Sequence, residues 1–157
     1  MSETTDRSIQ ETYAPNNVCY GCGPANERGI GLRSFVEGDQ LVATWQAESH
    51  HHAFDDMLCG GVIGTLLDCH CNWAGAWQLM QNNQLDSPPC TVTAEYKIVM
   101  NAPTPMKNPI RLQAHVVESS QRKAIVHGEL IAEDQVTATC EGIFVAVKEG
   151  HPAFHRW

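Results

Sequence analysis

Asp68 is the residue whose type and surroundings could do chemistry. It lies in "MLCGGVIGTLLDCHCNWAGAWQLM" (residues 57–80), where most residues are apolar or cysteine. A buried carboxylate costs free energy unless a partner compensates it. Burial would raise its pKa, which suits a general base acting on water or a carboxylate that attacks a substrate directly. Two interpretations stay open: a reactive carboxylate, or a structural one bonded to a hydroxyl or backbone group of a neighbouring strand.

Gly60 and Gly61 could supply the other half of such a reaction. If a helix begins near Gly60, its first N–H groups can stabilise an oxyanion. Gly61 and Asp68 would project from similar sides of this helix but lie about 10 Å apart along its axis. A carbonyl under attack needs its donors and its base within roughly 3 Å each. We therefore expect the glycine N–H groups of one subunit to act with Asp68 of another, which predicts a homodimer.

The elements that must position these residues follow from the hydrophobic pattern. Residues 61–80 are apolar around most of the helix circumference, which predicts a buried helix, and Asp55 or Asp56 could cap its start. Alternating segments on both sides predict antiparallel strands, and they cover residues 30–47 (a hairpin), 90–100, 110–120, 123–134 and 136–148. The order of elements predicts an α+β domain in which a curved antiparallel sheet of about five to six strands wraps one long central helix.

Length and charge narrow the class of protein. The chain has 157 residues, which fits one domain, and a net charge of −8, which argues against a nucleic-acid surface. We expect a flexible or loosely docked arm over residues 1–17, the domain over 18–149 and a tail over 150–157. Residues 1–17 lack the apolar run of a secretory signal, and polar residues interrupt 57–80, so no membrane span is expected. Seven cysteines without a signal predict a cytoplasmic protein with free thiols.

A metal site is an alternative interpretation, because several potential ligands cluster in the sequence. Cys19 and Cys22 form a Cys-x-x-Cys motif, His50–His52 are consecutive, and Cys69 and Cys71 flank a histidine. A structural zinc usually needs two ligand pairs, and only one Cys-x-x-Cys is present. Cys69 and Cys71 would also point about 200° apart on a helix. We therefore expect no metal and no cofactor.

Three motifs in order resemble a known family. They are "CYGCGPANERGIGL" (19–32), "CGGVIGTLLD" (59–68) and "VTAEYKIVMNAPTP" (92–105). Together they resemble the hotdog-fold acyl-CoA thioesterases of the phenylacetyl-CoA thioesterase-like type, over roughly Cys19 to Val147. The resemblance implies the hotdog fold, hydrolysis of an acyl-CoA thioester to free acid and CoA without a cofactor, and a homodimer or dimer of dimers.

The resemblance also assigns roles to residues. Asp68 falls on the catalytic carboxylate, and Gly60 and Gly61 fall on the glycines whose N–H groups hold the thioester oxygen. Thr93 falls on an assisting threonine. Cys59 stands where the family usually has a histidine, and we expect it to contact the substrate.

Three further expectations concern the surroundings of these residues. His52 and Leu58, near the start of the helix, are expected to contact the substrate. Simple alternation places Thr93 on the strand face opposite Val92 and Ala94, so it reaches Asp68 only through a bulge or from the partner subunit. Two other functions stay open: a non-catalytic acyl-binding or assembly module, and a hydratase or dehydratase of the same fold.

Overall fold

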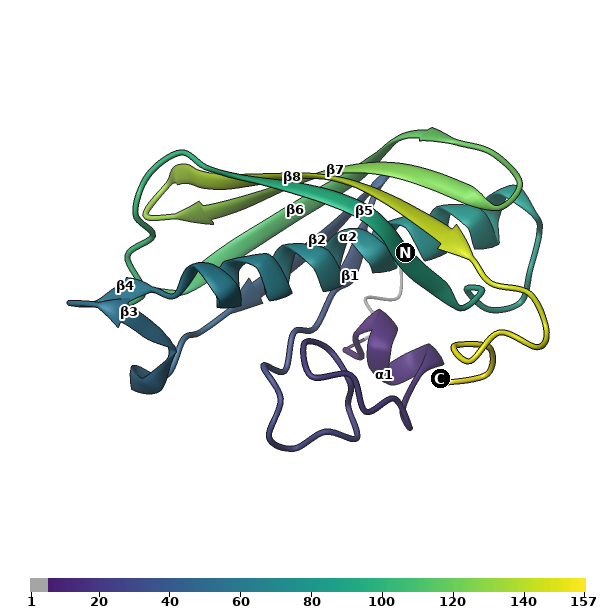
Figure 1. Ribbon diagram of the computed structural model, residues 1–157, viewed down its shortest axis with the longest axis horizontal. Helices are drawn as coiled ribbons and strands as arrows, with labels where there is room; N and C mark the ends of the chain where they lie inside the picture. Colours follow the sequence, from purple (N-terminus) through teal and green to yellow (C-terminus); the bar gives the residue numbers. More distant parts are fainter. Residues whose placement is uncertain (1–5) are drawn as a thin grey trace.

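One long helix lies against a single antiparallel sheet in the computed structural model, which describes residues 6–157. The helix α2 (Gly60–Asn82) runs beneath a six-stranded sheet of order β1-β2-β6-β7-β8-β5 (Figure 1). The strands are β1 (Phe35–Glu37), β2 (Gln40–Trp45), β5 (Thr91–Met100), β6 (Ile110–Ser119), β7 (Lys123–Ala132) and β8 (Gln135–Ala146). The predicted helix, the strand hairpin before it and the four strands after it are confirmed.

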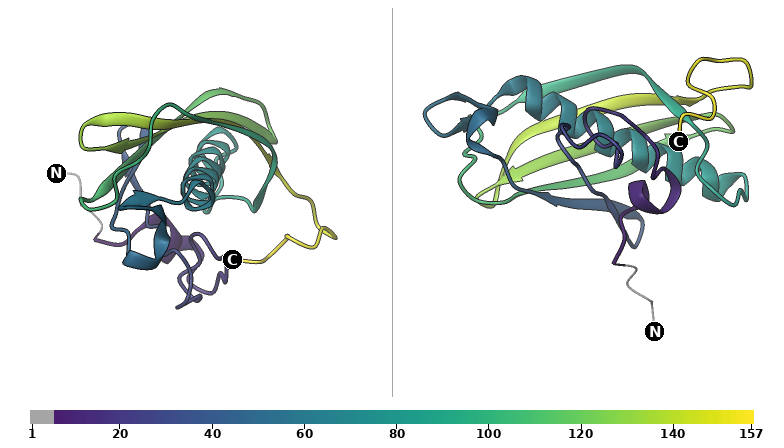
Figure 2. Two further views of the ribbon diagram at one scale, coloured as in Figure 1. Left: turned by 60° about the vertical axis from the view of Figure 1, so that its left-hand side comes forward. Right: turned by 90° about the horizontal axis from the view of Figure 1, so that it is seen from below.

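The core lies between the helix and the concave face of the sheet. Seen nearly along its axis, α2 sits inside the curve of the sheet (Figure 2). Leu112, Leu130 and Phe144, from β6, β7 and β8, and Leu66 and Leu67, from α2, are completely buried. Burial of one such side chain stabilises a fold by roughly 1.5–3 kcal/mol. The helix is buried on most sides because a second layer covers the face that the sheet leaves open.

That second layer is the N-terminal segment. The short helix α1 (Ile9–Tyr13) and the loop after it lie on the side of α2 away from the sheet (Figure 1). Ser8 caps α1: its hydroxyl accepts from the Glu11 N–H, and the Glu11 carboxylate accepts from the Ser8 N–H. Ile9 and Gln10 are buried. The predicted loose arm over 1–17 begins at 1–5, outside the described residues, whereas Ser8, Ala14 and Asn17 are buried along with the start of α1.

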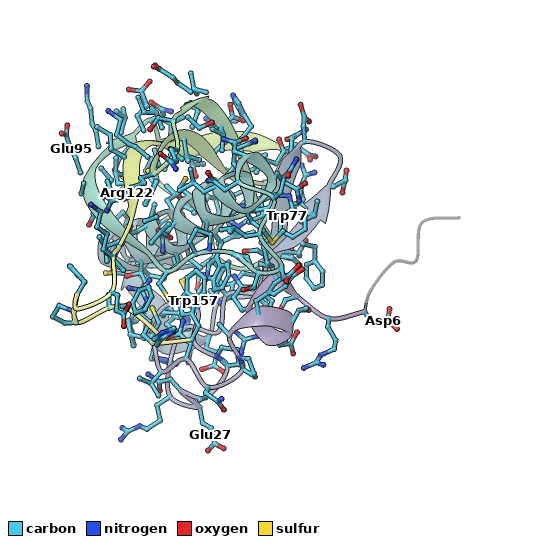
Figure 3. The ribbon with its side chains drawn as sticks, turned by 90° about the vertical axis from the view of Figure 1, so that its right-hand side faces the viewer. Asp6, Glu27, Trp77, Glu95, Arg122 and Trp157 are labelled. Carbon is cyan, nitrogen blue, oxygen red and sulfur yellow. The ribbon has the colours of Figure 1, made fainter. Side chains whose placement is uncertain are left out.

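The C-terminal segment is packed as well. The indole ring of Trp157 stacks on that of Trp73, with 4.3 Å between ring centroids. Arg156 Nη2 donates a hydrogen bond to the Thr91 carbonyl at 2.6 Å. Trp157 points back into the molecule, whereas Glu95 points outward from the edge of the sheet (Figure 3). The division into arm, domain and tail stays a prediction, but both terminal segments contribute to the packed structure.

The turn before α2 differs from the sequence prediction. Residues 49–58 form a short 3-10 helix, η1 (Ser49–His51), and a small hairpin of β3 (His52–Phe54) and β4 (Met57–Leu58). Asp55 and Asp56 occupy the turn of this hairpin, where Asp56 has a φ of 60°. The prediction that one of them caps α2 is therefore wrong: the N-cap is Cys59, whose side chain makes no capping hydrogen bond. Within residues 6–157, no helix has the length and apolar character needed to cross a membrane.

Candidate active site

Asp68 lies on the side of α2 that faces the edge strand β5. Thr93 Oγ1 donates a hydrogen bond of 2.7 Å to Asp68 Oδ1. The Asp68 side chain is half-buried, and this burial raises its pKa above the ordinary value. The hydrogen bond from Thr93 opposes the rise, and the nearby Cys19 adds to it. A carboxylate that is partly desolvated and held by one donor is suited to accept a proton from water.

A β-bulge brings Thr93 to Asp68. Thr93 pairs with Phe144 on β8, but Glu95 pairs with Ile143, so Ala94 is an extra residue in β5. Thr93 therefore shares the inner face with the buried Phe144. Beyond the bulge the inner face passes to even-numbered residues such as Ile98, which packs against the core. Of the two routes that the sequence left open, the bulge is the one that the structure contains.

A cavity of about 400 Å³ opens beside Asp68. Its walls come from α2, the first residues of β5, the loop around Cys19 and the C-terminal Arg156. Its lining residues are Asn17, Val18, Cys19, Cys22, Asp68, Cys69, Asn72, Trp73, Thr91, Val92, Thr93 and Arg156. Asn17 and Arg156 were not among the predicted site residues, because both lie in terminal segments that were expected to be loose.

Gly60 and Gly61 form the first turn of α2, as the sequence predicts. Both are exposed, and the first N–H groups of an α-helix have no intrahelical acceptor. Neither glycine is tightly enclosed: a Cβ atom at Gly60 would touch Met100 Cε at 3.6 Å, and one at Gly61 would touch Cys59 Sγ at 3.8 Å, both ordinary van der Waals distances. Because both glycines and Asp68 lie on the same helix, the axial separation of about 10 Å holds within one protomer. The structure does not bring these groups together in one chain.

The three expected substrate contacts occupy different environments. Cys59 is half-buried at the start of α2. His52 is exposed in β3, opposite Leu58 in β4. Leu58 is only 4% exposed and belongs to the hydrophobic core, so its side chain offers a substrate little surface within the protomer. His50 and His51 line a separate hollow of about 370 Å³ with Trp45, away from the cavity beside Asp68.

Three thiols meet at the wall of the Asp68 cavity. The sulfur atoms of Cys19, Cys22 and Cys69 all lie within 4.8 Å of one another. Hydrogen bonds from the side chains of Cys22 and Cys69 lower the pKa of Cys19, and its backbone neighbours add to this effect. The sequence offers only one Cys-x-x-Cys motif, and no second ligand pair was expected beside it. In the structure a single cysteine of α2, Cys69, joins the Cys-x-x-Cys loop, so the three thiols come from one motif and one helix.

His70 follows Asp68 by two residues but serves a different purpose. It is completely buried, and burial lowers its pKa to about 4. Its Nε2 lies 2.8 Å from the Leu41 carbonyl, and its Nδ1 lies 2.8 Å from the hydroxyl of Ser34, which also accepts from Gln10 Nε2 at 3.0 Å. A neutral ring that donates from Nε2 and accepts at Nδ1 satisfies all of these bonds. His70 thus fastens α1 and β2 to α2, and both its nitrogens are occupied away from Asp68.

Comparisons with known proteins agree with this architecture. No protein-family model and no curated protein sequence matches the chain. Among solved structures, a thioesterase superfamily protein from Shewanella loihica is 29% identical, covering 80% of this chain and 98% of its own, with a TM-score of 0.64. A phenylacetic acid degradation-related protein from Ralstonia eutropha is 16% identical, covering 80% and 92%, with a TM-score of 0.65. The PaaI protein of the phenylacetic acid degradation operon of E. coli is 14% identical, covering 76% and 81%, with a TM-score of 0.60.

The two more distant similarities, with identities of 16% and 14%, show the fold alone. The similarity to the Shewanella protein supports a hotdog-fold thioesterase. The structural neighbours of this chain are therefore thioesterase superfamily proteins, phenylacetic acid degradation-related ones among them, and its fold is the hotdog fold that the sequence motifs predict.

Proposed function

We propose that this protein hydrolyses an acyl-CoA thioester to a free acid and CoA, with Asp68 as the catalytic carboxylate. The observation that carries the proposal is the hydrogen bond of 2.7 Å from Thr93 to Asp68 at the wall of a cavity of about 400 Å³. The bond fixes one carboxylate oxygen and leaves the other for a water molecule. The raised pKa of Asp68 makes it a stronger base than an ordinary aspartate.

The reaction would proceed by attack of water. Asp68 accepts a proton from the water molecule while the water oxygen bonds to the carbonyl carbon of the thioester. The N–H groups of Gly60 and Gly61 hold the resulting oxyanion. The carbon–sulfur bond then breaks, and the CoA thiolate takes the proton from Asp68 as it leaves. Direct attack by the carboxylate is the other route that the same geometry allows.

This mechanism requires a second subunit, because Gly60 and Asp68 are too far apart along one helix. We propose a homodimer, or a dimer of dimers, in which the first turn of α2 from one protomer meets Asp68 of its partner. The edge strand β5 supports this arrangement. Its large side chains Tyr96 and Met100 are 47% and 49% exposed, and Met100 lies beside Gly60. A partner covering this edge would bury apolar surface and complete the site at the same time.

A second candidate function is a non-catalytic acyl-binding module. A half-buried aspartate without a chemical role would also need a hydrogen-bond donor, and Thr93 provides one to Asp68. Cys59, which takes the place of the family histidine, makes no capping hydrogen bond and offers only a weak donor near the start of the helix. The hydratase alternative has less support, because both nitrogens of the neighbouring His70 are engaged elsewhere.

The test is hydrolysis of short, medium and aromatic acyl-CoAs by the wild type and by Asp68→Asn. Product should be followed by chromatography, because the seven cysteines would react with a thiol-reactive dye. Loss of a general base typically lowers turnover about 10²- to 10⁴-fold. Asp39→Asn, in the exposed turn between β1 and β2, is the matched control and should leave turnover unchanged.

Turnover and folding stability, measured together for each variant, distinguish the thioesterase from the acyl-binding module. Turnover by the wild type that collapses in a folded Asp68→Asn variant supports the thioesterase. If no acyl-CoA is hydrolysed and Asp68→Asn is as stable as the wild type or more so, the carboxylate has a packing role and the acyl-binding module gains support. Equal turnover by Asp68→Asn and the wild type would contradict the assignment of Asp68.

A further inference from the structure

We propose that Cys19, Cys22 and Cys69 form a binding site for a thiophilic divalent cation, with Zn²⁺ as the natural occupant. The three sulfur atoms lie within 4.8 Å of one another. The site joins a loop to the long helix at the wall of the cavity that contains Asp68. This metal site does not depend on the proposed thioester hydrolysis, and it can be tested by metal binding without an activity assay.

The sulfur positions suit tetrahedral coordination. Zinc–sulfur bonds of about 2.3 Å place two sulfurs of a tetrahedron about 3.8 Å apart. The Cys19 and Cys69 sulfurs are 3.8 Å apart, so this pair already has the required spacing. Cys22 completes a triangle in which no two sulfurs are more than 4.8 Å apart. A disulfide would instead draw one pair to about 2 Å and leave the third thiol unused.

Two glycines, Gly21 and Gly23, allow the loop backbone to approach α2 closely enough for the sulfurs to meet. A Cβ atom at Gly21 would overlap Cys69 Sγ, so a residue with a side chain at this position would separate the loop from the helix. A Cβ atom at Gly23 would overlap the Asn17 carbonyl and the Cys19 backbone nitrogen. The Gly23 N–H donates to the Cys19 carbonyl at 2.8 Å and closes the turn that holds both loop cysteines. A side chain at either glycine would therefore disturb the loop that holds Cys19 and Cys22 or push it away from Cys69 on α2.

Hydrogen-bond donors around the sulfurs suit the thiolate form that binds a metal. The indole Nε1–H of the buried Trp73 donates to Cys22 Sγ at 3.3 Å. Such outer donors orient a ligand and stabilise its negative charge. Arg156, which lines the same cavity, carries a positive charge that offsets part of the net negative charge of three thiolates and one divalent ion. Soft thiolate ligands select zinc over Mg²⁺ and Ca²⁺, which prefer oxygen.

The fourth coordination position would face the cavity. All three cysteines line it, and the Asp68 carboxylate is close by without belonging to the group of mutually close ligand atoms. Water or a small anionic ligand can therefore take the fourth position. Bound in this way, the ion would tie residues 19–23 to α2 and make the wall beside Asp68 rigid.

The experiment uses the full chain, reduced and freed of metal with a chelator. Zn²⁺ affinity is measured by competition with a chromophoric chelator, and Co²⁺ is added as a spectroscopic probe. We expect one ion per chain and a Co²⁺ spectrum with thiolate charge-transfer absorption and strong tetrahedral bands. Cys19→Ser and Cys69→Ser should each weaken binding by about 100-fold or more, since even loss of an outer-shell partner costs 10- to 100-fold.

Matched controls exclude the other candidate ligands. Cys90→Ser changes a thiol outside the cluster, and His50→Gln changes the exposed histidine of the Glu48–His50–His51 group. Both should bind Zn²⁺ as the wild type does. The proposal is overturned if the Co²⁺ spectrum lacks thiolate charge transfer, if Cys69→Ser keeps the wild-type affinity, or if the protein prepared without oxidant has lost two thiols to a disulfide. If a serine variant fails to fold, the wild-type spectrum alone still decides.

Discussion

Replacement of Thr93 by valine isolates the bond that holds Asp68. Valine has nearly the same shape as threonine, so the change removes the hydroxyl without leaving a cavity. Removing the donor to a charged acceptor typically costs about 1.5–3 kcal/mol. Asp68 is half-buried beside an open cavity, so water replaces part of the lost interaction. We expect the free energy of unfolding to fall by about 1–2 kcal/mol, roughly a tenfold change in the unfolding constant.

Thr91 provides a matched control on the same strand and face. Its hydroxyl is buried and has no hydrogen-bond partner among residues 6–157. Thr91→Val therefore removes an unsatisfied polar group, and the free energy of unfolding should stay the same or rise by up to about 1 kcal/mol. Thr93→Ser keeps the donor and removes one half-buried methyl group, so it should cost no more than about 0.8 kcal/mol.

Urea denaturation of the wild type and these three variants measures the differences directly. The decisive comparison is between the two valine variants, which share chemistry, strand and orientation. Two results would contradict the prediction: equal stability of Thr93→Val and Thr93→Ser, or a shift of the urea midpoint by the same amount in both valine variants. Either result would mean that the bond of 2.7 Å does not hold Asp68 in solution.

Three further predictions concern the core and the terminal segments. Gly128→Ala should destabilise the protein by about 1–3 kcal/mol, because a Cβ atom there overlaps Cys71 Sγ, and adding Cys71→Ala should restore much of the stability in thermal melts. The pKa of His70 is lowered to about 4, so the unfolded chain binds a proton first as the pH falls below about 6.5. Urea stability should therefore be full above that pH and should drop by about 2 kcal/mol at about pH 5, and His70→Asn should lose this dependence. Trp157→Ala should remove the stacked contact with Trp73 and cost about 2–3 kcal/mol in thermal melts, whereas Trp157→Phe should retain most of it.

The sequence alone determined the main elements and their order. The apolar residues from Gly61 to Met80 predict a helix buried on most sides, and the observed α2 extends from Gly60 to Asn82. Alternation over the later segments predicts the four strands β5 to β8. These features are local, because the periodicity of side chains along one segment reflects how that segment meets a core. The places of Gly60, Gly61 and Asp68 on the helix could be predicted for the same reason, because spacing along the sequence sets the position of each residue on a helix.

The positions of side chains between segments were decided only by the tertiary structure. Strict alternation turns Thr93 away from Asp68, and one extra residue, Ala94, reverses that result. No local signal marks Ala94, because a bulge is a shift in the pairing register between two strands and depends on the residues of both. The small hairpin before α2 is equally invisible, since its two strands have only three and two residues.

The terminal segments and the thiol cluster show the same limit at longer range. The arm over 1–17 and the tail over 150–157 are expected to be loose because they are chain ends, yet Ile9, Ala14 and Trp157 pack against the core. Cys69 is 50 positions from Cys19, and their sulfurs meet at 3.8 Å because the loop crosses the helix at Gly21. The free energy of such contacts comes from packing segments that are distant in the sequence. Local pattern therefore predicts which elements form, and only the packed chain decides which side chains meet.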